Sequence, residues 1–299
     1  MQTKHQIQSL LASAGISPDK RLGQHFLMDL NLMRLLIEAA QISSDDVVLE
    51  VGCGTGSLTQ GLSERGGAVI AVEIDENLTE ITKGQLADKK NVEIITIDIL
   101  KNKNTISPVV AEAIVSARKG RRGRFLLVAN LPYNAASAVM MNLIDGPLIA
   151  DAMYVTVQKE IAERMTACPG SKHYGTLSIF LGACGDVKTI RILKPTVFWP
   201  QPQVWSAIVG FVRSEEKARR IKNAEIFRDV VALFMQHRRK MIKGCARLAG
   251  GELAKINDWQ GIFEKCSINS TDRPEQIPVE GYIAIANLCG KAPARRKKA

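Results

Sequence analysis

Short apolar runs alternate with stretches of helical periodicity along the first 212 residues. The runs are rich in valine, isoleucine and leucine and occupy residues 47–51, 68–73, 92–98, 125–130, 153–157 and 207–212. Residues 31–40, ahead of the first run, carry apolar side chains at helical spacing. Strands that alternate with helices indicate a mostly parallel sheet, because parallel neighbours need a long crossover between them. We therefore predict the α/β class, with a Rossmann-like sheet.

The pattern changes to helical from about residue 213 onward. Residues 224–243 are predicted as one amphipathic helix whose apolar face holds Ile226, Val230 and Phe234. We expect a first domain over 1–212, a smaller helical C-terminal domain over 213–290 and a disordered tail over 291–299. Residues 101–124, which are polar, basic and interrupted by glycine, are predicted as a surface connection with an exposed end at 118–124.

Composition excludes several classes of protein. The chain has 299 residues, 46% hydrophobic and 23% charged, which is ordinary for a globular protein. No apolar run approaches the ~18–20 residues of a membrane-spanning helix, and the N-terminus has neither a signal-peptide nor a transit-peptide pattern. The six cysteines form no CxxC pair, so we predict no disulfide framework and no metal site. A cytoplasmic location is the expectation.

Positive charge is concentrated in the last third of the chain. Residues 1–210 contain 21 basic and 20 acidic residues, whereas residues 211–299 contain 19 basic and 10 acidic residues. This imbalance indicates chemistry in the first part and contact with a polyanion in the second, although a basic surface that only aids solubility has the same composition.

A glycine-rich turn follows the first predicted strand. Residues 50–56 read EVGCGTG, with Gly52, Gly54 and Gly56 ahead of a predicted helix. Glycines at such a turn let a ligand approach backbone amides at a helix N-terminus. Dinucleotide sites use GxGxxG, but Ser57 stands where the third glycine of that pattern falls. The GxGxG spacing and the acidic Glu50 instead resemble S-adenosylmethionine (SAM) methyltransferases, although the turn alone does not identify a ligand.

Acidic residues end the next two predicted strands. Glu73 follows the glycine turn by about twenty residues, where a carboxylate accepts hydrogen bonds from ribose hydroxyls. Asp98 ends the third strand, where it can accept the adenine amine. Either residue alone could simply cap a helix. Together with the glycine turn they line up at one edge of the sheet, where open α/β sheets bind ligands.

The fourth predicted strand ends in Asn130, Leu131, Pro132 and Tyr133. This run resembles the (N/D)PPY-type motif of enzymes that methylate exocyclic amines of bases. The Asn130 side-chain oxygen and the Leu131 carbonyl would accept the two N–H bonds of an adenine amine. Pro132 would stiffen the turn that aims them, and Tyr133 would offer a face to a flipped base.

The chain as a whole resembles the KsgA-type rRNA adenine dimethyltransferase family. The matching motifs run in family order and occupy residues 21–27 (RLGQHFL), 158–160 (QKE), 169–175 (PGSKHYG), 197–206 (VFWPQPQVWS) and 236–240 (QHRRK). The resemblance implies SAM-dependent dimethylation of two adjacent adenosines in a hairpin loop near the 3′ end of small-subunit rRNA. It further implies that the partner is the assembling small ribosomal subunit.

The resemblance also implies roles for individual residues. It places SAM against residues that include the glycine turn, namely His25, Leu27, Gly52, Gly54, Gly56, Glu73, Asp98 and Asn130. It places the target base at Asn130, Leu131, Pro132 and Tyr133, with Phe198 as a second stacking face. Arg238, Arg239 and Lys240 are predicted to contact RNA phosphates because they lie in the basic half of the chain, although by spacing alone the triplet could equally be a solvated helix face. Two departures are His25, where many members have asparagine, and Trp205, where a small or acidic residue is usual.

Two other kinds of function remain open from the sequence. One is a related adenine methyltransferase acting on large-subunit rRNA, as the Erm-type enzymes do, or on DNA. The other is a ribosome-assembly or transcription factor that keeps the fold without the chemistry. The intact glycines, Glu73, Asp98 and the Asn-Leu-Pro-Tyr run favour an enzyme. We expect a monomer that needs no membrane.

Overall fold

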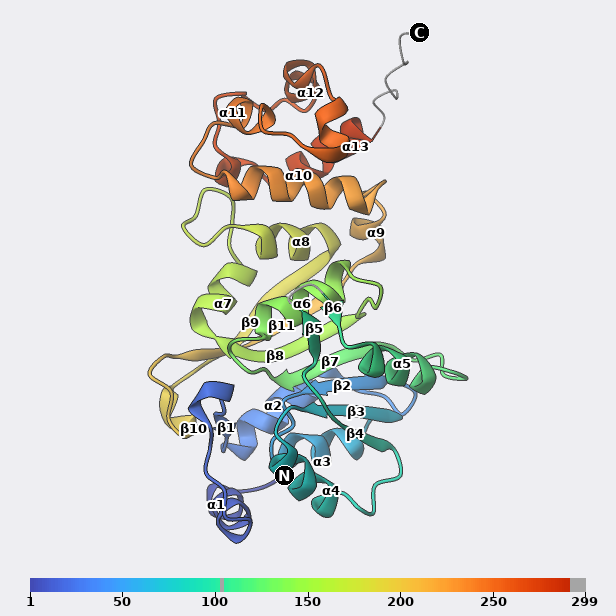
Figure 1. Cartoon of the computed structure of the whole chain (residues 1–299), viewed down its shortest axis with the longest axis vertical. Helices are drawn as coiled ribbons and strands as arrows, with labels where there is room; N and C mark the ends of the chain where they lie inside the picture. The colour runs from blue at the N-terminus through green and yellow to red at the C-terminus, as the bar shows by residue number, and fades with distance from the viewer. Residues whose placement is uncertain (103–104, 291–299) are drawn as a thin grey trace. The chain divides into compact units, whose positions relative to one another are not determined.

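The computed structural model describes residues 1–102 and 105–290 (Figure 1). The tail 291–299, which the sequence predicts to be disordered, lies outside the described residues. The chain divides into two compact units, the first comprising Met1–Ala162 and Val187–Val212 and the second comprising Glu163–Asp186 and the chain from Arg213. The predicted border at residue 212 coincides with one of these borders. Residues 163–186, which the sequence places in the first domain, belong instead to the second unit.

The first unit contains a sheet that, over the described residues, has seven strands (Figure 1). Their order across the sheet is β4 (Val92–Thr96), β3 (Ala68–Glu73), β2 (Val47–Val51), β7 (Phe125–Asn130), β8 (Ala152–Gln158), β11 (Ser206–Arg213) and β9 (Gly185–Leu193). The strands from β4 to β8 are parallel to one another, and β11 runs antiparallel to β8. The predicted fold class is therefore confirmed. Strand β9 was not predicted.

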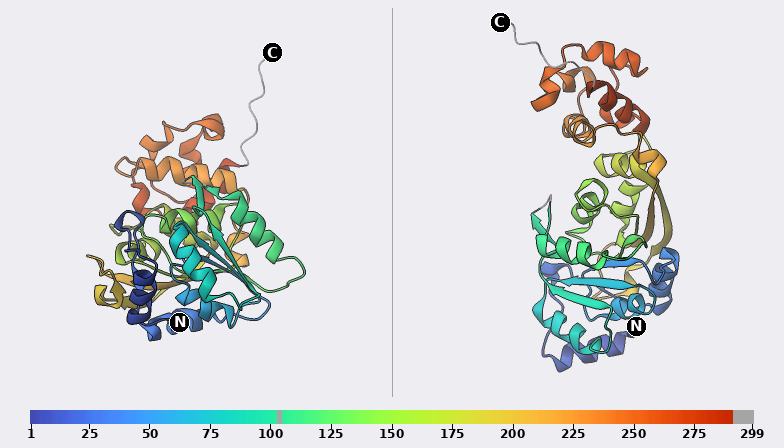
Figure 2. Two further views of the ribbon diagram at one scale, coloured as in Figure 1. Left: turned by 60° about the horizontal axis from the view of Figure 1, so that its bottom comes forward. Right: turned by 90° about the vertical axis from the view of Figure 1, so that its right-hand side faces the viewer.

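Helices cover both faces of the sheet, as its buried strands require. Every residue of β2 is buried. Helices α2 (Leu30–Ala40) and α3 (Ser57–Ser63) pack on one face through a shared hydrophobic cluster. Helix α5 (Pro108–Ala117) lies on the other face and contacts β2 and β3 (Figure 2). The predicted surface connection at 101–124 is thus wrong over α5, whereas residues 118–122 are exposed as expected.

The remaining shorter elements belong to the first unit, except that α7 continues past its boundary at Ala162. Helix α1 (Lys4–Ser13) packs through Ile7 and Leu11 against Leu78 of α4. Strands β1 and β10 form an antiparallel pair, as do β5 and β6. The bounds of the remaining elements are β1 Phe26–Leu27, β5 Leu100–Asn102, β6 Thr105–Ile106, β10 Phe198–Trp199, α4 Glu76–Gln85, α6 Ala136–Asp145 and α7 Lys159–Met165, with 3-10 turns at Lys20–Leu22 and Pro195–Val197.

The second unit is helical. Helix α8 is buried along most of its length and contacts α9, α10 and α13. Phe180 of α8 meets Phe227 of α10 edge to face at 5.1 Å, and Phe234 of α10 contacts Tyr282 of α13. This packing explains why residues 163–186 join this unit. Its bounds are α8 Thr176–Cys184, α9 Glu215–Ala218, α10 Ala224–Gln236, α11 Ile242–Ala246, α12 Trp259–Lys265 and α13 Val279–Cys289, with 3-10 turns at Gly251–Lys255 and Pro274–Gln276.

The predicted helix over 224–243 is too long. Helix α10 ends at Gln236, and residues 237–240 form a turn closed by a 2.8 Å hydrogen bond from Lys240 N to the His237 carbonyl. Residues 238–240 are exposed, and the next buried residue, Ile242, begins the separate helix α11. Among the described residues, no helix is long and apolar enough to cross a membrane.

Candidate active site

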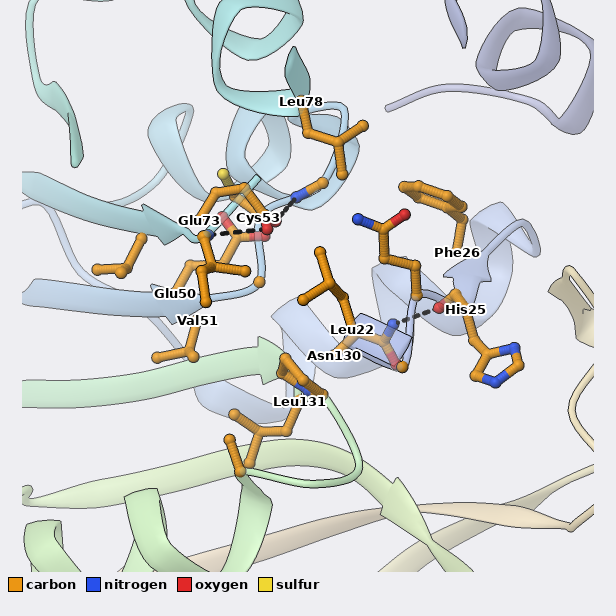
Figure 3. Close-up of a pocket in the computed structure, with 18 of the residues that line it drawn as sticks. Leu22, His25, Phe26, Glu50, Val51, Cys53, Glu73, Leu78, Asn130 and Leu131 are labelled. Atoms are coloured by element: carbon orange, nitrogen blue, oxygen red, sulfur yellow. Dashed lines mark hydrogen bonds between the residues drawn. The ribbon is translucent and has the colours of Figure 1, made fainter. Parts of the chain in front are cut away.

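A cavity of about 290 Å³ opens at the carboxyl ends of the parallel strands in the first unit (Figure 3). This is the edge at which open α/β sheets bind ligands. Most of the site residues predicted in this unit line it, namely His25, Leu27, Gly52, Gly54, Glu73, Asp98, Asn130, Leu131, Pro132 and Tyr133. Segments more than 100 residues apart in the sequence therefore meet at one site.

The glycine turn connects β2 to α3 and forms one wall of the cavity. Gly52 and Gly54 have φ angles of 77° and 60°, in the left-handed region that side chains disfavour. A Cβ on Gly52 would lie 3.0 Å from Cγ of Pro132, and one on Gly54 would lie 2.9 Å from the Phe26 ring. The turn thus brings bare backbone to the cavity. Gly56 is set back, with Thr82 beside its Cβ position.

Glu73 ties the glycine turn to the end of β3. Its carboxylate accepts hydrogen bonds from the backbone N–H groups of Gly54 (2.9 Å), Ile74 (2.9 Å) and Asp75 (3.1 Å). The side chain is only 6% exposed, and burial raises the pKa of its carboxyl above the usual value. A carboxylate has about four acceptor positions, so three backbone bonds leave room for one more partner.

Glu50 places a second carboxyl beside Glu73 (Figure 3). It is 1% exposed, and its Oε2 has no hydrogen-bond partner among the described residues. Burial raises the pKa of Glu50 to about 8, and the nearby charge of Glu73 acts in the same direction. A buried carboxyl oxygen that lacks a partner favours a cationic or hydrogen-bond-donating group of a ligand beside it.

Asp98 lies just beyond the strand that was predicted to contain it. Strand β4 ends at Thr96, and Asp98 belongs to the turn that follows. One carboxylate oxygen, Oδ1, accepts the Leu100 N–H at 2.9 Å. The residue is exposed and lines the cavity.

In the side-chain amide of Asn130, the last residue of β7, the nitrogen has a hydrogen-bond partner and the oxygen has none among the described residues. Its Nδ2 donates to the His25 carbonyl at 2.9 Å (Figure 3), so its Oδ1 is left as the acceptor. That Oδ1 is buried and has no partner among the described residues. An orphaned buried acceptor costs about 1–3 kcal/mol, so this atom is placed where a donor on a ligand would satisfy it.

The residues after Asn130 form a tight turn beside it. The Leu131 side chain is 1% exposed, and its N–H donates to the Thr156 carbonyl at 3.1 Å. The Pro132 carbonyl accepts the Ala135 and Ala136 N–H groups, both at 3.1 Å. These bonds fix the path of the chain between β7 and α6.

Tyr133 is positioned from two sides. Its hydroxyl shares a 2.8 Å hydrogen bond with Oγ of Ser206, and its ring lies 5.3 Å from the His25 ring. The His25 Nδ1 in turn lies 2.7 Å from the Pro200 carbonyl. Burial raises the pKa of the Tyr133 phenol, so it remains a neutral aromatic surface at ordinary pH.

Phe198 does not lie at the cavity, contrary to the prediction of a stacking face. Its side chain is 2% exposed and packs in the hydrophobic cluster with Leu27, Tyr154 and Leu193. Pairing of β10 with β1 sets Phe198 opposite Leu27 and directs it into this core. The structure therefore gives it a packing role.

Two glutamines that the sequence analysis did not select support the site. The Gln2 side chain donates to the Thr55 carbonyl (2.9 Å) and accepts from the Thr55 hydroxyl (2.6 Å). Gln24 donates to Asp75, the N-cap of α4, at 2.9 Å. Gln24 lies within the motif at 21–27 and Gln2 lies in none of the quoted motifs, and the role of each depends on a partner more than 50 residues away in the sequence.

The basic triplet Arg238, Arg239 and Lys240 lies in the second unit. All three side chains are exposed, and they occupy the turn after α10. We call these three residues the basic turn. They are thus not a helix face, as the sequence suggested. An Arg238 guanidinium nitrogen reaches the Lys172 carbonyl at 3.4 Å.

A mostly parallel sheet, a glycine turn at its carboxyl edge and buried acceptors around one cavity define a SAM-dependent methyltransferase. The comparisons with known proteins are more specific. The family model described as ribosomal RNA adenine dimethylase matches residues 17–287. The chain therefore belongs to the ribosomal RNA adenine dimethylase family.

Relatives from distant organisms match along nearly the whole chain. A ribosomal RNA small subunit methyltransferase A of Ligilactobacillus salivarius is 32% identical over 285 residues, covering 95% of this chain and 94% of the relative. A probable ribosomal RNA small subunit methyltransferase A of Methanopyrus kandleri is 34% identical over 288 residues, covering 96% and 97%.

Solved structures share the fold. A dimethyladenosine transferase from Plasmodium falciparum is similar with a TM-score of 0.72 and 22% identity, covering 89% of this chain and 98% of that one. The 23S rRNA methyltransferase ErmE is similar with a TM-score of 0.63 and 21% identity, covering 89% and 100%. At these identities the likeness establishes the architecture alone.

Proposed function

We propose that this protein dimethylates the exocyclic amines of two adjacent adenosines in a hairpin loop near the 3′ end of small-subunit rRNA. The substrate would be the small ribosomal subunit during its assembly. Family membership and the names of its relatives support this choice of RNA. The observation that carries the chemistry is the buried, unpartnered Oδ1 of Asn130 at the cavity wall.

The cavity fits SAM, which supplies an activated methyl group when bound. Glu73 would accept a ribose hydroxyl with the acceptor position that its three backbone bonds leave free. Asp98, with Oδ1 accepting the Leu100 N–H, would offer a carboxylate oxygen to the adenine amine. Gly52 and Gly54 would present backbone to the ligand, and His25 and Leu27 would close the cavity opposite them. Gly56 would contribute by shaping the turn.

Asn130 would act on the target base by accepting a hydrogen bond from its amine. The lone pair of an adenine amine is delocalised into the ring, so the nitrogen is a weak nucleophile. Acceptance of its N–H bonds by Asn130 Oδ1 and the Leu131 carbonyl favours a more tetrahedral nitrogen with a localised lone pair. The Tyr133 ring would stack on the base, and Pro132 would hold the turn in place. The amine loses its proton to solvent after the methyl group has been transferred, so no strong general base is needed.

The second unit would contact RNA phosphates. Its basic turn is exposed, and the chain from residue 211 carries the excess of positive charge. Lysine and arginine that neutralise phosphates release counterions and so add affinity without reading sequence. We propose that the protein acts as a monomer in the cytoplasm.

Transfer of labelled methyl groups to a panel of acceptors tests this function. The panel holds immature small subunits, mature small subunits, large-subunit rRNA and DNA, each incubated with labelled SAM. We expect label in immature small subunits and none in large-subunit rRNA or DNA. Preferential labelling of large-subunit rRNA or of DNA would assign the protein to a related methyltransferase. No labelling of any acceptor, in a protein that still binds RNA, would indicate a binding factor.

A further inference from the structure

Trp205 is an exposed aromatic residue that packs against no other aromatic ring among the described residues. Its side chain is 46% exposed, and that of the preceding Val204 is 44% exposed. The other two tryptophans contact aromatic rings, Trp199 that of Phe26 and Trp259 those of Phe234 and Phe263. Among the described residues, no ring contacts Trp205. Val204 and Trp205 are consecutive, and contiguous exposed apolar surface that includes a large aromatic ring is typical of interaction sites.

The backbone of Trp205 is fixed next to the residue that bonds Tyr133. The Trp205 carbonyl accepts the Lys159 N–H at 2.8 Å, at the point where β8 passes into α7. The next residue, Ser206, is completely buried and bonds the Tyr133 hydroxyl at 2.8 Å. Sheet pairing fixes this register, because Ser206 lies opposite Gln158 of β8. Trp205 therefore lies one residue from the group that positions the base-stacking tyrosine.

The same segment is anchored to the site at its other end. The Pro200 carbonyl lies 2.7 Å from Nδ1 of His25, whose ring contacts that of Tyr133. The segment 200–206 thus begins on a carbonyl that contacts His25 and ends on Ser206, which bonds Tyr133. Trp205 is exposed near the end of this segment. An exposed ring on a segment fixed at both ends is a preorganised platform, which loses little entropy on binding.

The occupant that fits this platform is an RNA base. A family that methylates rRNA adenines must admit an RNA strand to the cavity, and a base drawn out of its stack leaves neighbouring bases with an open face. Stacking of an aromatic side chain on such a base contributes about 1–3 kcal/mol per base. We propose that Trp205 stacks on the nucleotide next to the target adenosine. This inference rests on the proposed function, because it requires an RNA adenine as the substrate.

Steady-state methylation of immature small subunits by Trp205→Ala and Trp205→Phe tests the proposal. A stacking energy of about 1–3 kcal/mol predicts a KM for RNA raised roughly five- to 150-fold in Trp205→Ala. We expect an unchanged kcat at saturating RNA and an unchanged Kd for SAM. Trp205→Phe should recover most of the loss, since it retains a ring. The matched control is Val115→Ala, which removes a similarly exposed apolar side chain from α5.

Tryptophan fluorescence gives a second readout that needs no folded alanine variant. In Trp199→Phe/Trp259→Phe the only remaining tryptophan is Trp205, and a hairpin RNA carrying the target loop should quench it while SAM alone should not. An unchanged KM for RNA in Trp205→Ala would overturn the proposal. Where that variant does not fold, the absence of quenching by the hairpin RNA would overturn it. Either result with an active wild type leaves the proposed function intact. A wild type that methylates no RNA would instead overturn the proposed function.

Discussion

Removal of the Glu73 carboxylate should weaken SAM binding by a predictable amount. Three of its about four acceptor positions are used by backbone N–H groups, at 2.9, 2.9 and 3.1 Å, and the remaining one is proposed to accept a ribose hydroxyl. A hydrogen bond to a charged group contributes about 1.5–3 kcal/mol, which corresponds to roughly ten- to a hundredfold in Kd. Glu73→Ala loses this bond and also leaves three backbone N–H groups of the turn without their acceptor.

Isothermal titration calorimetry with SAM measures this effect, and Glu73→Gln repeats the measurement with a side chain of the same size. Glutamine keeps the size of the side chain but replaces one acceptor oxygen with a donor, so it should also bind SAM more weakly than the wild type. Glu93→Gln, an exposed glutamate on the neighbouring strand β4, is the matched control and should bind normally. A Kd for SAM within about twofold of the wild type in a folded Glu73→Ala would refute the assignment, as would tight NAD binding by the wild type.

Four further predictions follow from single contacts. Asn130→Ala should fold and bind RNA but lower kcat by about 10²–10³, the usual cost of a positioned transition-state group of ~3–4 kcal/mol; near-normal turnover would contradict the mechanism. Because burial raises the pKa of Glu50 to about 8, the folded state binds the Glu50 proton more tightly than the unfolded state does. In thermal unfolding, the stability of the wild type should therefore fall relative to that of Glu50→Gln from pH 5 to pH 8 and then level off; a stability difference that does not change with pH would exclude this titration. Gln2→Ala should lower the free energy of unfolding by about 1–3 kcal/mol and weaken SAM binding, unlike the exposed His5→Ala, and equal behaviour of the two would remove Gln2 from the site. Neutralising the basic turn should reduce the slope of log affinity against log salt by up to about 2–3 units without affecting SAM binding; an unchanged slope would direct attention to the exposed residues 118–122 instead.

The strands of the catalytic sheet were predictable because their burial on both faces leaves continuous apolar runs. Strands β2, β3 and β7 have the predicted bounds. Strand β9 was missed because most of its residues are not buried, so its sequence GDVKTIRIL lacks such a run. Helix α5 was missed because the basic, glycine-containing residues after it concealed a helix whose Val110 and Ile114 are buried.

Some features of the site could likewise be predicted from the sequence, and others could not. That Gly52, Glu73 and Asn130 line one cavity could be predicted, because strand ends and turns carry them in recognisable spacing. The orphaned Oδ1 of Asn130 could not be predicted, because it depends on the His25 carbonyl, 105 residues away, taking the other half of the amide. Phe198 was placed wrongly because the pairing that turns it into the core is a long-range contact of two very short strands.

Mass-spectrometric mapping of modified nucleosides tests the central claim most directly. Small subunits that lack the modification are incubated with SAM and either the wild type or Asn130→Ala. The modified nucleosides are then located in rRNA fragments by tandem mass spectrometry. We predict N6,N6-dimethyladenosine at two adjacent positions of a hairpin loop near the 3′ end of small-subunit rRNA with the wild type, and little or none with Asn130→Ala. Methyl groups at other positions or on other atoms, or equal modification by Asn130→Ala, would contradict it.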